Sequence, residues 1–392
     1  MSALIPAREY GLVFATAALV TFLITGLVRV LARRIGAVTE IRDRDMHTLP
    51  TPRMGGVAVY IGLAAGVLVA FHLPNLSQAF STSSEIPGVL VAGAVICLVG
   101  VLDDRFDLDA VTKLAGQVLA AGVLVMFGVQ WTQVWLPLDH GGTLVSLDQA
   151  QGLLITVVIT VVLTNAMNFI DGLDGLLAGV ALISAVGIFI FSAHQLAVSH
   201  NGAAASQPPL IAAALIGACL GFLPHNFDPA RIFLGDSGSM FIGLTMAAAI
   251  VSAGGKLDSS TYGPRSTIAA LAPLIVVLAV VFIPLLDLLL AVIRRTREGR
   301  HPFSADTRHL HHRMLKIGHT KRQAVLTFYL WAAVLSGSAV SLAFLPWTTA
   351  VGPAVVLFLL AVVVSAWPRV RARRLSRART AGASPEITRV TP

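Results

Sequence analysis

The sequence predicts an all-α polytopic membrane protein with about eleven transmembrane helices. Of its 392 residues, 56% are hydrophobic and only 12% are charged, and the mean hydropathy is +0.80. This composition is typical of an integral membrane protein and excludes an ordinary soluble domain. A membrane-spanning helix needs about 20 mostly apolar residues. Eleven apolar runs approach this length, near residues 10–31, 55–73, 87–102, 112–128, 152–169, 175–193, 208–224, 238–253, 268–293, 324–345 and 349–366.

The distribution of positive charge orients these helices. In an eleven-span arrangement, all but three of the 28 Lys and Arg residues lie on one side of the membrane or at helix ends on that side; the exceptions are Arg8, Lys256 and Arg265. Because Lys and Arg gather in cytoplasmic loops, we expect the N-terminus outside and the C-terminus in the cytoplasm. Topology therefore accounts for the net charge of +8, and we expect no nucleic-acid partner.

We expect one transmembrane domain, residues 1–366, followed by a basic tail, residues 367–392. The tail is rich in Arg, Ser and Thr, which predicts a disordered cytoplasmic segment near anionic lipid headgroups. A small extracytoplasmic hairpin is expected near residues 131–148. There Trp131 and Trp135 are interpreted as anchors at the membrane surface.

The first cytoplasmic loop ends in the segment PTPRMGG, residues 50–56. Pro52 restricts the backbone, and the two glycines permit close backbone contact where the second helix begins. Arg53 is a candidate for binding an anionic substrate. Helix orientation and contact with lipid headgroups are the alternative explanation for arginines in this loop.

The third apolar run ends in four carboxylates, Asp103, Asp104, Asp107 and Asp109. Carboxylates this close repel one another unless a proton or a cation joins them. Oxygen ligands with few other donors suit Mg²⁺, particularly when a substrate phosphate completes the coordination. Lys113, at the start of the next run, is suited to hold a phosphate as a point charge. An acidic, solvated helix end is the simpler alternative.

A polar segment, LTNAMNFIDGLDGL at residues 163–176, interrupts the apolar runs. Asn165, Asn168, Asp171 and Asp174 recur every three residues, which predicts neighbours on roughly one helical face. Carboxylates at the mouth of a hydrophobic segment are costly, so they indicate a functional site. A plain polar loop between two spans is the alternative.

Asp236 lies just before the eighth apolar run, where a helix is expected to begin. A helix N-terminus favours anionic groups through its free N–H groups. Asn226 and Phe233 precede it in the same loop. A simple capping role would also explain Asp236, but its expected side of the membrane matches that of the other acidic loops. Asp287, inside the ninth run, costs about 3 kcal/mol if it is unpaired in lipid, and we assign it no role.

The loop after the ninth run contains RHLHHR, residues 308–313. A histidine cluster suggests zinc, but no cysteine is nearby and arginines flank the cluster. Imidazole and guanidinium groups together favour a diphosphate. Together with the acidic loops, this set is what phosphoryl transfer requires: a metal to bridge oxygen atoms, and cationic groups for the developing charge.

Five segments, in order over about residues 10–345, resemble the polyprenyl-phosphate N-acetylhexosamine-1-phosphate transferase family of the MraY/WecA/TagO type. They are PTPRMGG, DDRFD at 103–107, NAMNFIDGLDG at 165–175, FLGDSGS at 233–239 and RHLHHRM at 308–314. The HLHH sequence resembles the WecA-like branch, which disfavours a MurNAc-pentapeptide substrate. The resemblance implies transfer of GlcNAc-1-phosphate from UDP-GlcNAc to an undecaprenyl or decaprenyl phosphate, as the first membrane step of a cell-envelope glycan pathway.

The resemblance also implies residue roles. Asp103 and Asp104 match the family's catalytic pair, with Asp107 and Asp171 as further catalytic carboxylates. Asp236 and Asn168 match the positions that hold Mg²⁺, for which Mn²⁺ is a substitute. Phe233 matches the residue that stacks on uracil, Asp174 the one at the uracil edge, and Lys113 the one at the lipid phosphate. Further substrate-binding positions are Arg53, Asn226, Arg308, His309, His311 and His312.

The same resemblance implies a bacterial inner-membrane enzyme with its site on the cytoplasmic face, and it leaves open whether the protein is a homodimer. Two other classes remain as alternatives. An Mg²⁺-dependent intramembrane prenyltransferase also uses Asp-rich motifs, but it needs no nucleotide pocket. An ion-coupled transporter needs ionisable residues at the bilayer midplane, whereas here Asp287 alone is placed so.

Overall fold

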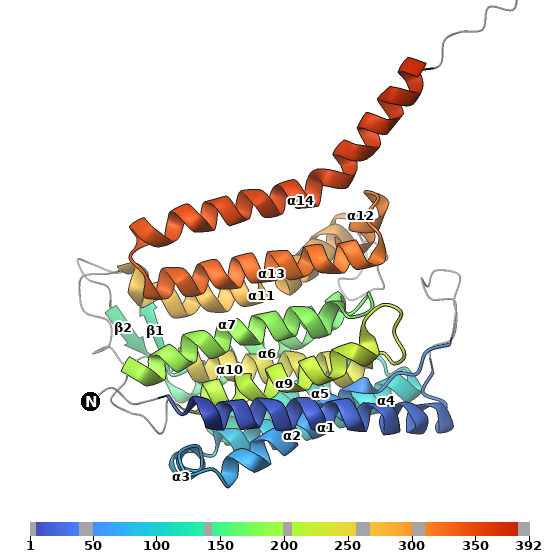
Figure 1. Ribbon diagram of the computed structural model, residues 1–392. Coiled ribbons are helices and arrows are strands. Elements are labelled where there is room, and N and C mark those ends of the chain that lie inside the picture. Colours follow the sequence, from blue (N-terminus) through green and yellow to red (C-terminus); the bar gives the residue numbers. More distant parts are fainter. Residues whose placement is uncertain are drawn as a thin grey trace, which may run out of the picture.

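The computed structural model describes residues 5–38, 50–136, 143–198, 206–255, 267–299 and 310–382. Long helices lie side by side and form one bundle, with the N-terminus and a short β-hairpin at the same end (Figure 1). The helices are α1 (Ala7–Arg34), α2 (Gly55–Phe71), α3 (Gln78–Thr82), α4 (Glu85–Phe106), α5 (Ala110–Met126), α6 (Gln149–Ile170), α7 (Leu176–Val198), α9 (Gln207–Asn226), α10 (Gly235–Gly254), α11 (Thr267–Arg297), α12 (Leu310–Lys316), α13 (Lys321–Phe344) and α14 (Trp347–Gly382).

Each of the eleven apolar runs falls within or almost within one of these helices. Within the described residues, eight helices are long and apolar enough to cross a membrane. The shorter apolar helices α2 and α5 contain the second and fourth runs, and α11 contains the ninth. The all-helical, multi-pass prediction is therefore confirmed at this level.

The predicted hairpin is present. β1 (Gln133–Leu136) pairs antiparallel with β2 (Thr143–Ser146), and Gln133 lies opposite Ser146. The interpretation of Trp131 as a surface anchor is wrong, because its side chain is only 4% exposed. The Trp131 backbone N–H donates to Thr156 Oγ1 at 2.9 Å. Its ring packs so closely on α10 that a Cβ on Gly254 would lie 3.0 Å from it. A large apolar ring gains more from this burial than from a place at the interface.

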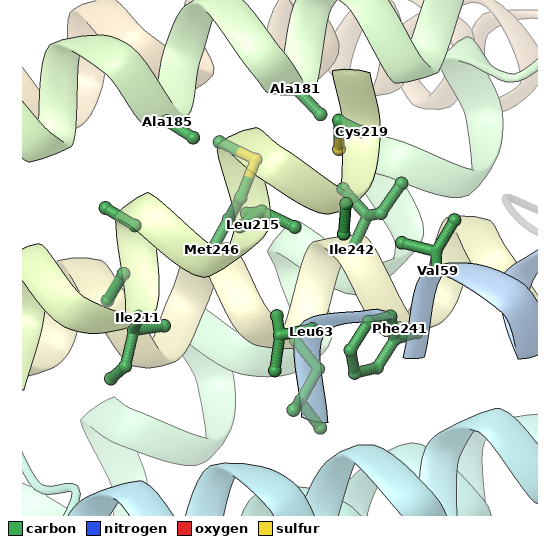
Figure 2. Close-up of a cluster of buried hydrophobic side chains, with 14 of the residues drawn as sticks. Val59, Leu63, Ala181, Ala185, Ile211, Leu215, Cys219, Phe241, Ile242 and Met246 are labelled. Carbon is green, nitrogen blue, oxygen red and sulfur yellow. The ribbon is translucent and has the colours of Figure 1, made fainter. Parts of the chain in front are cut away.

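Helix α10 is the centre of the bundle. Its apolar window is entirely buried, and α2, α4, α6, α7, α9 and α11 pack around it. Its sequence is rich in Gly, Ala and Ser, and such small side chains let neighbouring helices approach closely within a membrane. Figure 2 shows this core, with α10 contributing Phe241, Ile242 and Met246, and its neighbours contributing Val59, Leu63, Ala181, Ala185, Ile211, Leu215 and Cys219.

The first turn of α10 touches the backbones of α2 and α4 directly. A Cβ on Gly56 would lie 2.0 Å from the Gly238 backbone nitrogen, and one on Gly100 would lie 2.3 Å from Ser237 Cα. The Gly56 N–H also donates to the Leu234 carbonyl at 3.0 Å. This contact fixes where three helices meet and therefore where their polar ends lie.

Helix α14 continues as far as Gly382, past residue 367 where the sequence predicts the start of a disordered tail. It bends and extends beyond the bundle (Figure 1). Arg and Ala dominate residues 369–380, and both are good helix formers, which accounts for the extra turns. Residues 383–392 lie outside the described part of the chain.

Replacing Gly56 by alanine should destabilise the protein by about 2 kcal/mol, because the added methyl group overlaps the α10 backbone. The measurement is reversible unfolding in mixed micelles. Gly337→Ala on α13 is the matched control: a Cβ there meets nothing within 4 Å, so this variant should gain up to about 1 kcal/mol. Equal effects of the two substitutions would contradict the packing described.

Candidate functional site

The polar ends of four helices meet at the end of the bundle opposite the hairpin. Lys113, in the first turn of α5, joins two of them: its Nζ lies 2.7 Å from Asp103 Oδ2 and 3.0 Å from Asp236 Oδ2. Asp103 lies in the last turn of α4 and Asp236 in the first turn of α10, so residues far apart in sequence share one ammonium group. The sequence places Lys113 beside a substrate phosphate; here its partners are carboxylates.

Asp104 holds the N-terminus of α10. Its carboxylate accepts hydrogen bonds from the backbone N–H of Asp236 at 2.9 Å, the backbone N–H of Ser237 at 3.2 Å and the Ser237 hydroxyl at 2.8 Å. Gly235 adopts φ +68°, and a Cβ there would lie 2.4 Å from Asp104 Oδ2. Glycine is therefore needed for the close approach, and both Asp104 oxygens are committed to positioning α10.

Asp236 lies in the first turn of α10, one residue inside the helix rather than at the cap expected from the sequence. Asn168 reaches it from α6: the Asn168 amide donates to Asp236 Oδ1 at 3.0 Å and to Ser239 Oγ at 2.8 Å. The two residues predicted to hold a metal are therefore neighbours. Ser239, which the sequence reasoning missed, accepts from Asn168, and Ser237, also missed, donates to Asp104.

The polar face predicted for residues 165–174 is wrong as a helical feature, because α6 ends at Ile170. Asn165 points elsewhere and donates to Gln117 Oε1 at 2.6 Å. Asp171 follows the last helical residue, and Asp174 lies in the subsequent loop. Gly172 directly follows the C-cap Asp171, and its low helix propensity helps to end α6 before the three-residue spacing can form a face.

Asp171 is the carboxyl of this cluster whose ionisation is most strongly disfavoured. Burial, followed by the charges of Asp236 and Asp104, raises the pKa of its carboxyl to about 8, although Arg53 acts in the opposite direction. Within the described residues its carboxylate accepts no hydrogen bond. Asp171 is thus the member of the cluster with uncommitted oxygen atoms, and Arg53 is the cation that faces it.

The loop that carries Asp171 and Asp174 is fixed at its far end. Asp174 Oδ2 accepts from the Ala230 N–H at 2.9 Å, and the Gly175 N–H donates to Asn226 Oδ1 at 3.1 Å. The Tyr329 hydroxyl on α13 donates to the Gly175 carbonyl at 2.5 Å. The sequence analysis did not identify Tyr329. A tyrosine within an apolar run could have indicated such a role, because its hydroxyl requires a hydrogen-bond partner when it is buried.

The remaining predicted residues are placed unequally. Asp107 is exposed, ends α4 at φ 54° and does not join the cluster. Both polar atoms of the Asn226 side chain are hydrogen-bonded to backbone groups. Its Oδ1 accepts from the Gly175 N–H, and its Nδ2 donates to the Ile232 carbonyl at 3.0 Å. Phe233 is half-buried, and its N–H donates to the Pro52 carbonyl at 2.9 Å. Outside the described residues lie Arg308 and His309, as do the side chains of His311 and His312, whose backbone begins α12.

The donor set fits a divalent cation. In the described part of the chain, no three His, Cys, Asp or Glu side chains already converge as metal ligands. However, four carboxylates (Asp103, Asp104, Asp171 and Asp236) share two facing cations, Lys113 and Arg53. This surplus of negative charge on oxygen donors suits Mg²⁺, which takes one or two carboxylates and completes its shell with phosphate and water.

Comparisons with known proteins give one family. Residues 86–254 match the family described as Glycosyl transferase family 4. The chain is 52% identical to decaprenyl-phosphate N-acetylglucosaminephosphotransferase of Mycobacterium tuberculosis, over 88% of this chain and 86% of that protein. It is 51% identical to the protein of that name from Mycolicibacterium smegmatis, over 94% and 90%. It is 30% identical to undecaprenyl-phosphate alpha-N-acetylglucosaminyl 1-phosphate transferase of Escherichia coli K12, over 95% and 96%.

Mg²⁺ affinity should rise with pH up to about 8 and then level off. Below the raised pKa of Asp171 this carboxyl holds a proton that the cation must displace, at a cost of up to about tenfold in affinity per pH unit. Isothermal titration calorimetry between about pH 6 and pH 9 measures this slope.

The Asp171→Asn variant should lose the part of the slope above about pH 7, because burial and the neighbouring Asp236 raise the pKa of the remaining Asp103 carboxyl only to about 7. Asp109→Asn is the control, because Asp109 is fully exposed and the Thr112 hydroxyl lowers its pKa, so it stays ionised throughout. An unchanged slope in Asp171→Asn would show that another group controls the competition.

Proposed function

This chain belongs to glycosyl transferase family 4, and from that premise we propose that it transfers GlcNAc-1-phosphate from UDP-GlcNAc to a polyprenyl phosphate, giving polyprenyl-diphospho-GlcNAc and UMP. The observation that carries this proposal is identity over nearly the whole chain to enzymes named for this transfer. The acidic cluster where α4, α5, α6 and α10 meet supplies the chemistry. The two mycobacterial relatives are named for decaprenyl phosphate, so this is the first acceptor to test.

The reaction forms one phosphorus–oxygen bond and breaks another. An oxygen of the acceptor phosphate attacks the sugar-proximal phosphorus of UDP-GlcNAc, and the bond to the bridging oxygen breaks, so that its electron pair leaves with UMP. In-line positioning and neutralisation of charge dominate the catalysis of such transfers. The protein must therefore hold two phosphorylated substrates beside one patch of carboxylates.

The carboxylates divide this work. Asp103 and Lys113 lie on the α4–α5 side of the cluster, where Lys113 can attract the acceptor phosphate once its carboxylate partners have another cation. Asp171, whose pKa is raised to about 8, is suited to take a proton from that phosphate in its ionised form, after its own proton has left. Asp104 is a positioning residue, since α10 occupies both of its oxygens.

Mg²⁺ is the proposed cofactor, with Mn²⁺ as a substitute. Asp236 and Asn168 would hold it, and when bound it would neutralise charge on the diphosphate oxygens. Asp236 already carries Lys113 and Asn168 as partners, so its orientation is fixed before any ligand arrives.

We assign the uridine end of the donor to the loop before α10. Phe233 and Asp174 are both tied to this region: the Phe233 N–H donates to Pro52, and Asp174 accepts from the Ala230 N–H. An aromatic face and a carboxylate are the groups that stacking and edge recognition of a base require. Arg53 and the segment with Arg308, His309, His311 and His312 are proposed to hold the diphosphate.

We propose a cytoplasmic location for this site at the inner face of a bacterial plasma membrane, where nucleotide sugars are available. The protein is a multi-pass membrane protein, and nearly all its Lys and Arg residues lie on the same side as the acidic cluster in the sequence-based topology. The lipid product would begin a cell-envelope glycan.

Purified protein in detergent should form labelled lipid from radiolabelled UDP-GlcNAc and decaprenyl phosphate in the presence of Mg²⁺. Asp236→Asn should lower this rate by at least about 10²-fold, while the variant still inserts and unfolds as the parent does. Asp109→Asn, which changes an exposed cap of α5, should keep nearly full activity. Labelled lipid from UDP-GalNAc or UDP-MurNAc-pentapeptide alone would refute the proposed donor.

Tyr329→Phe should lower kcat by roughly tenfold or more with little change in KM, because release of Gly175 lets the Asp171 loop move from its productive position. Tyr60→Phe removes a similar buried hydroxyl, which donates to the Leu90 carbonyl at 3.3 Å away from the cluster. Both variants should lose about 1 kcal/mol of stability. Equal kcat values in the two would deny Tyr329 a positioning role.

A further inference from the structure

Two arginines lie beside His225, at the end of α9, and take no part in the acidic site. They are Arg29 on α1 and Arg231 in the loop before α10. We infer that they form, with His225, a binding site for the phosphate headgroup of an anionic phospholipid, whose acyl chains lie along α1 and α9. This inference is independent of the transferase proposal.

The site is held by a rigid helix pair. Helices α1 and α9 pack so closely that a Cβ on Gly217 would lie 2.3 Å from the Phe14 carbonyl oxygen, and one on Gly221 would lie 2.1 Å from that of Ala18. Such contact between backbones fixes the two helix ends relative to each other. The basic residues on those ends are therefore kept together without a ligand.

The orientation of the His225 ring is also fixed. Its Nε2 lies 3.0 Å from the Phe22 carbonyl oxygen, which can only accept, so Nε2 must donate. The ring also packs on Phe22, with centroids 4.8 Å apart. The Arg231 backbone N–H donates to the His225 carbonyl at 2.8 Å, which places this arginine beside the imidazole.

The charge at this place is one-sided. Arg231 and Arg29 are the two charged groups that act on the His225 ring. Arg29 Nε is buried and has no hydrogen-bond partner among the described residues. The nearby acidic residue of the loop, Asp228, is paired with Arg322 at 3.0 Å. A buried guanidinium donor without a partner costs stability, and an anion with several acceptor oxygens would satisfy it.

The surroundings select a lipid over a free anion. Immediately along the two helices lie exposed apolar side chains: Leu19 (59% exposed), Phe22 and Leu23 on α1, and Leu220 on α9. Large apolar side chains exposed beside a basic end match an amphiphile, with headgroup and chains in register. A soluble phosphate would gain only the charged contacts.

The test compares lipids of opposite headgroup chemistry on the full chain in detergent. Native mass spectrometry titrations with phosphatidylglycerol and phosphatidylcholine should show the anionic lipid binding about tenfold more tightly. Arg29→Gln should remove most of that preference, and Arg231→Gln should do the same from the loop. Arg34→Gln is the matched control, because Arg34 is exposed in the last turn of the same helix and loses the same charge.

Each outcome decides the matter. Equal loss of preference in Arg29→Gln and Arg34→Gln would reduce the effect to general surface charge and overturn the site. Protection against thermal unfolding by inorganic phosphate or glycerol 3-phosphate, equal to that by phosphatidylglycerol, would overturn the lipid assignment. If Arg29→Gln does not fold, Arg231→Gln carries the test, and an unchanged preference in it refutes the inference.

Discussion

The hydrogen bonds from the N-terminus of α10 to Asp104 are the interaction on which the rest of this structure depends. A fully buried helix cannot leave its first N–H groups to water, so another residue must satisfy them. Asp104 does so from α4, and its own buried charge is made tolerable by the three donors it receives. Because Asp103 precedes Asp104 on α4 and Asp236 is itself one of the donors on α10, the bonds that complete α10 also set the geometry of the acidic cluster.

Hydrogen-bond donors divide chemically identical aspartates into two groups. Asp104 and Asp174 receive backbone N–H groups and hold segments in place. Asp236 and Asp103 share one lysine, Asp103 Oδ1 also accepts from the Leu108 N–H at 2.8 Å, and Asp171 faces only charges. The first group therefore serves as part of the scaffold, whereas the second retains oxygen atoms for exchangeable partners. A negative surplus in the second group is what a phosphoryl-transfer site needs before its cation and substrates arrive.

Much of this architecture can be predicted from the sequence, because apolar runs of sufficient length leave the backbone few alternatives in lipid. The convergence of 103–104, 168–171 and 236 follows from counting which loops share a side. The sequence-based predictions that the structure contradicts concern features that depend on tertiary packing. Trp131 is buried because it packs against α10. The three-residue spacing of residues 165–174 does not produce one helical face because α6 ends at Ile170. Tyr329 lies 154 residues from Gly175, and Lys113 lies 123 residues from Asp236, and no local pattern encodes such pairs.

The double salt bridge of Lys113 has a consequence for how the site fills. The Lys113 ammonium and an incoming divalent ion compete for the same carboxylate oxygens. Metal binding is therefore an exchange of one cation for another. The net affinity is then the small difference between two large electrostatic energies. Modest changes near Lys113 would therefore shift the metal concentration at which the enzyme switches on far more than any single contact would suggest.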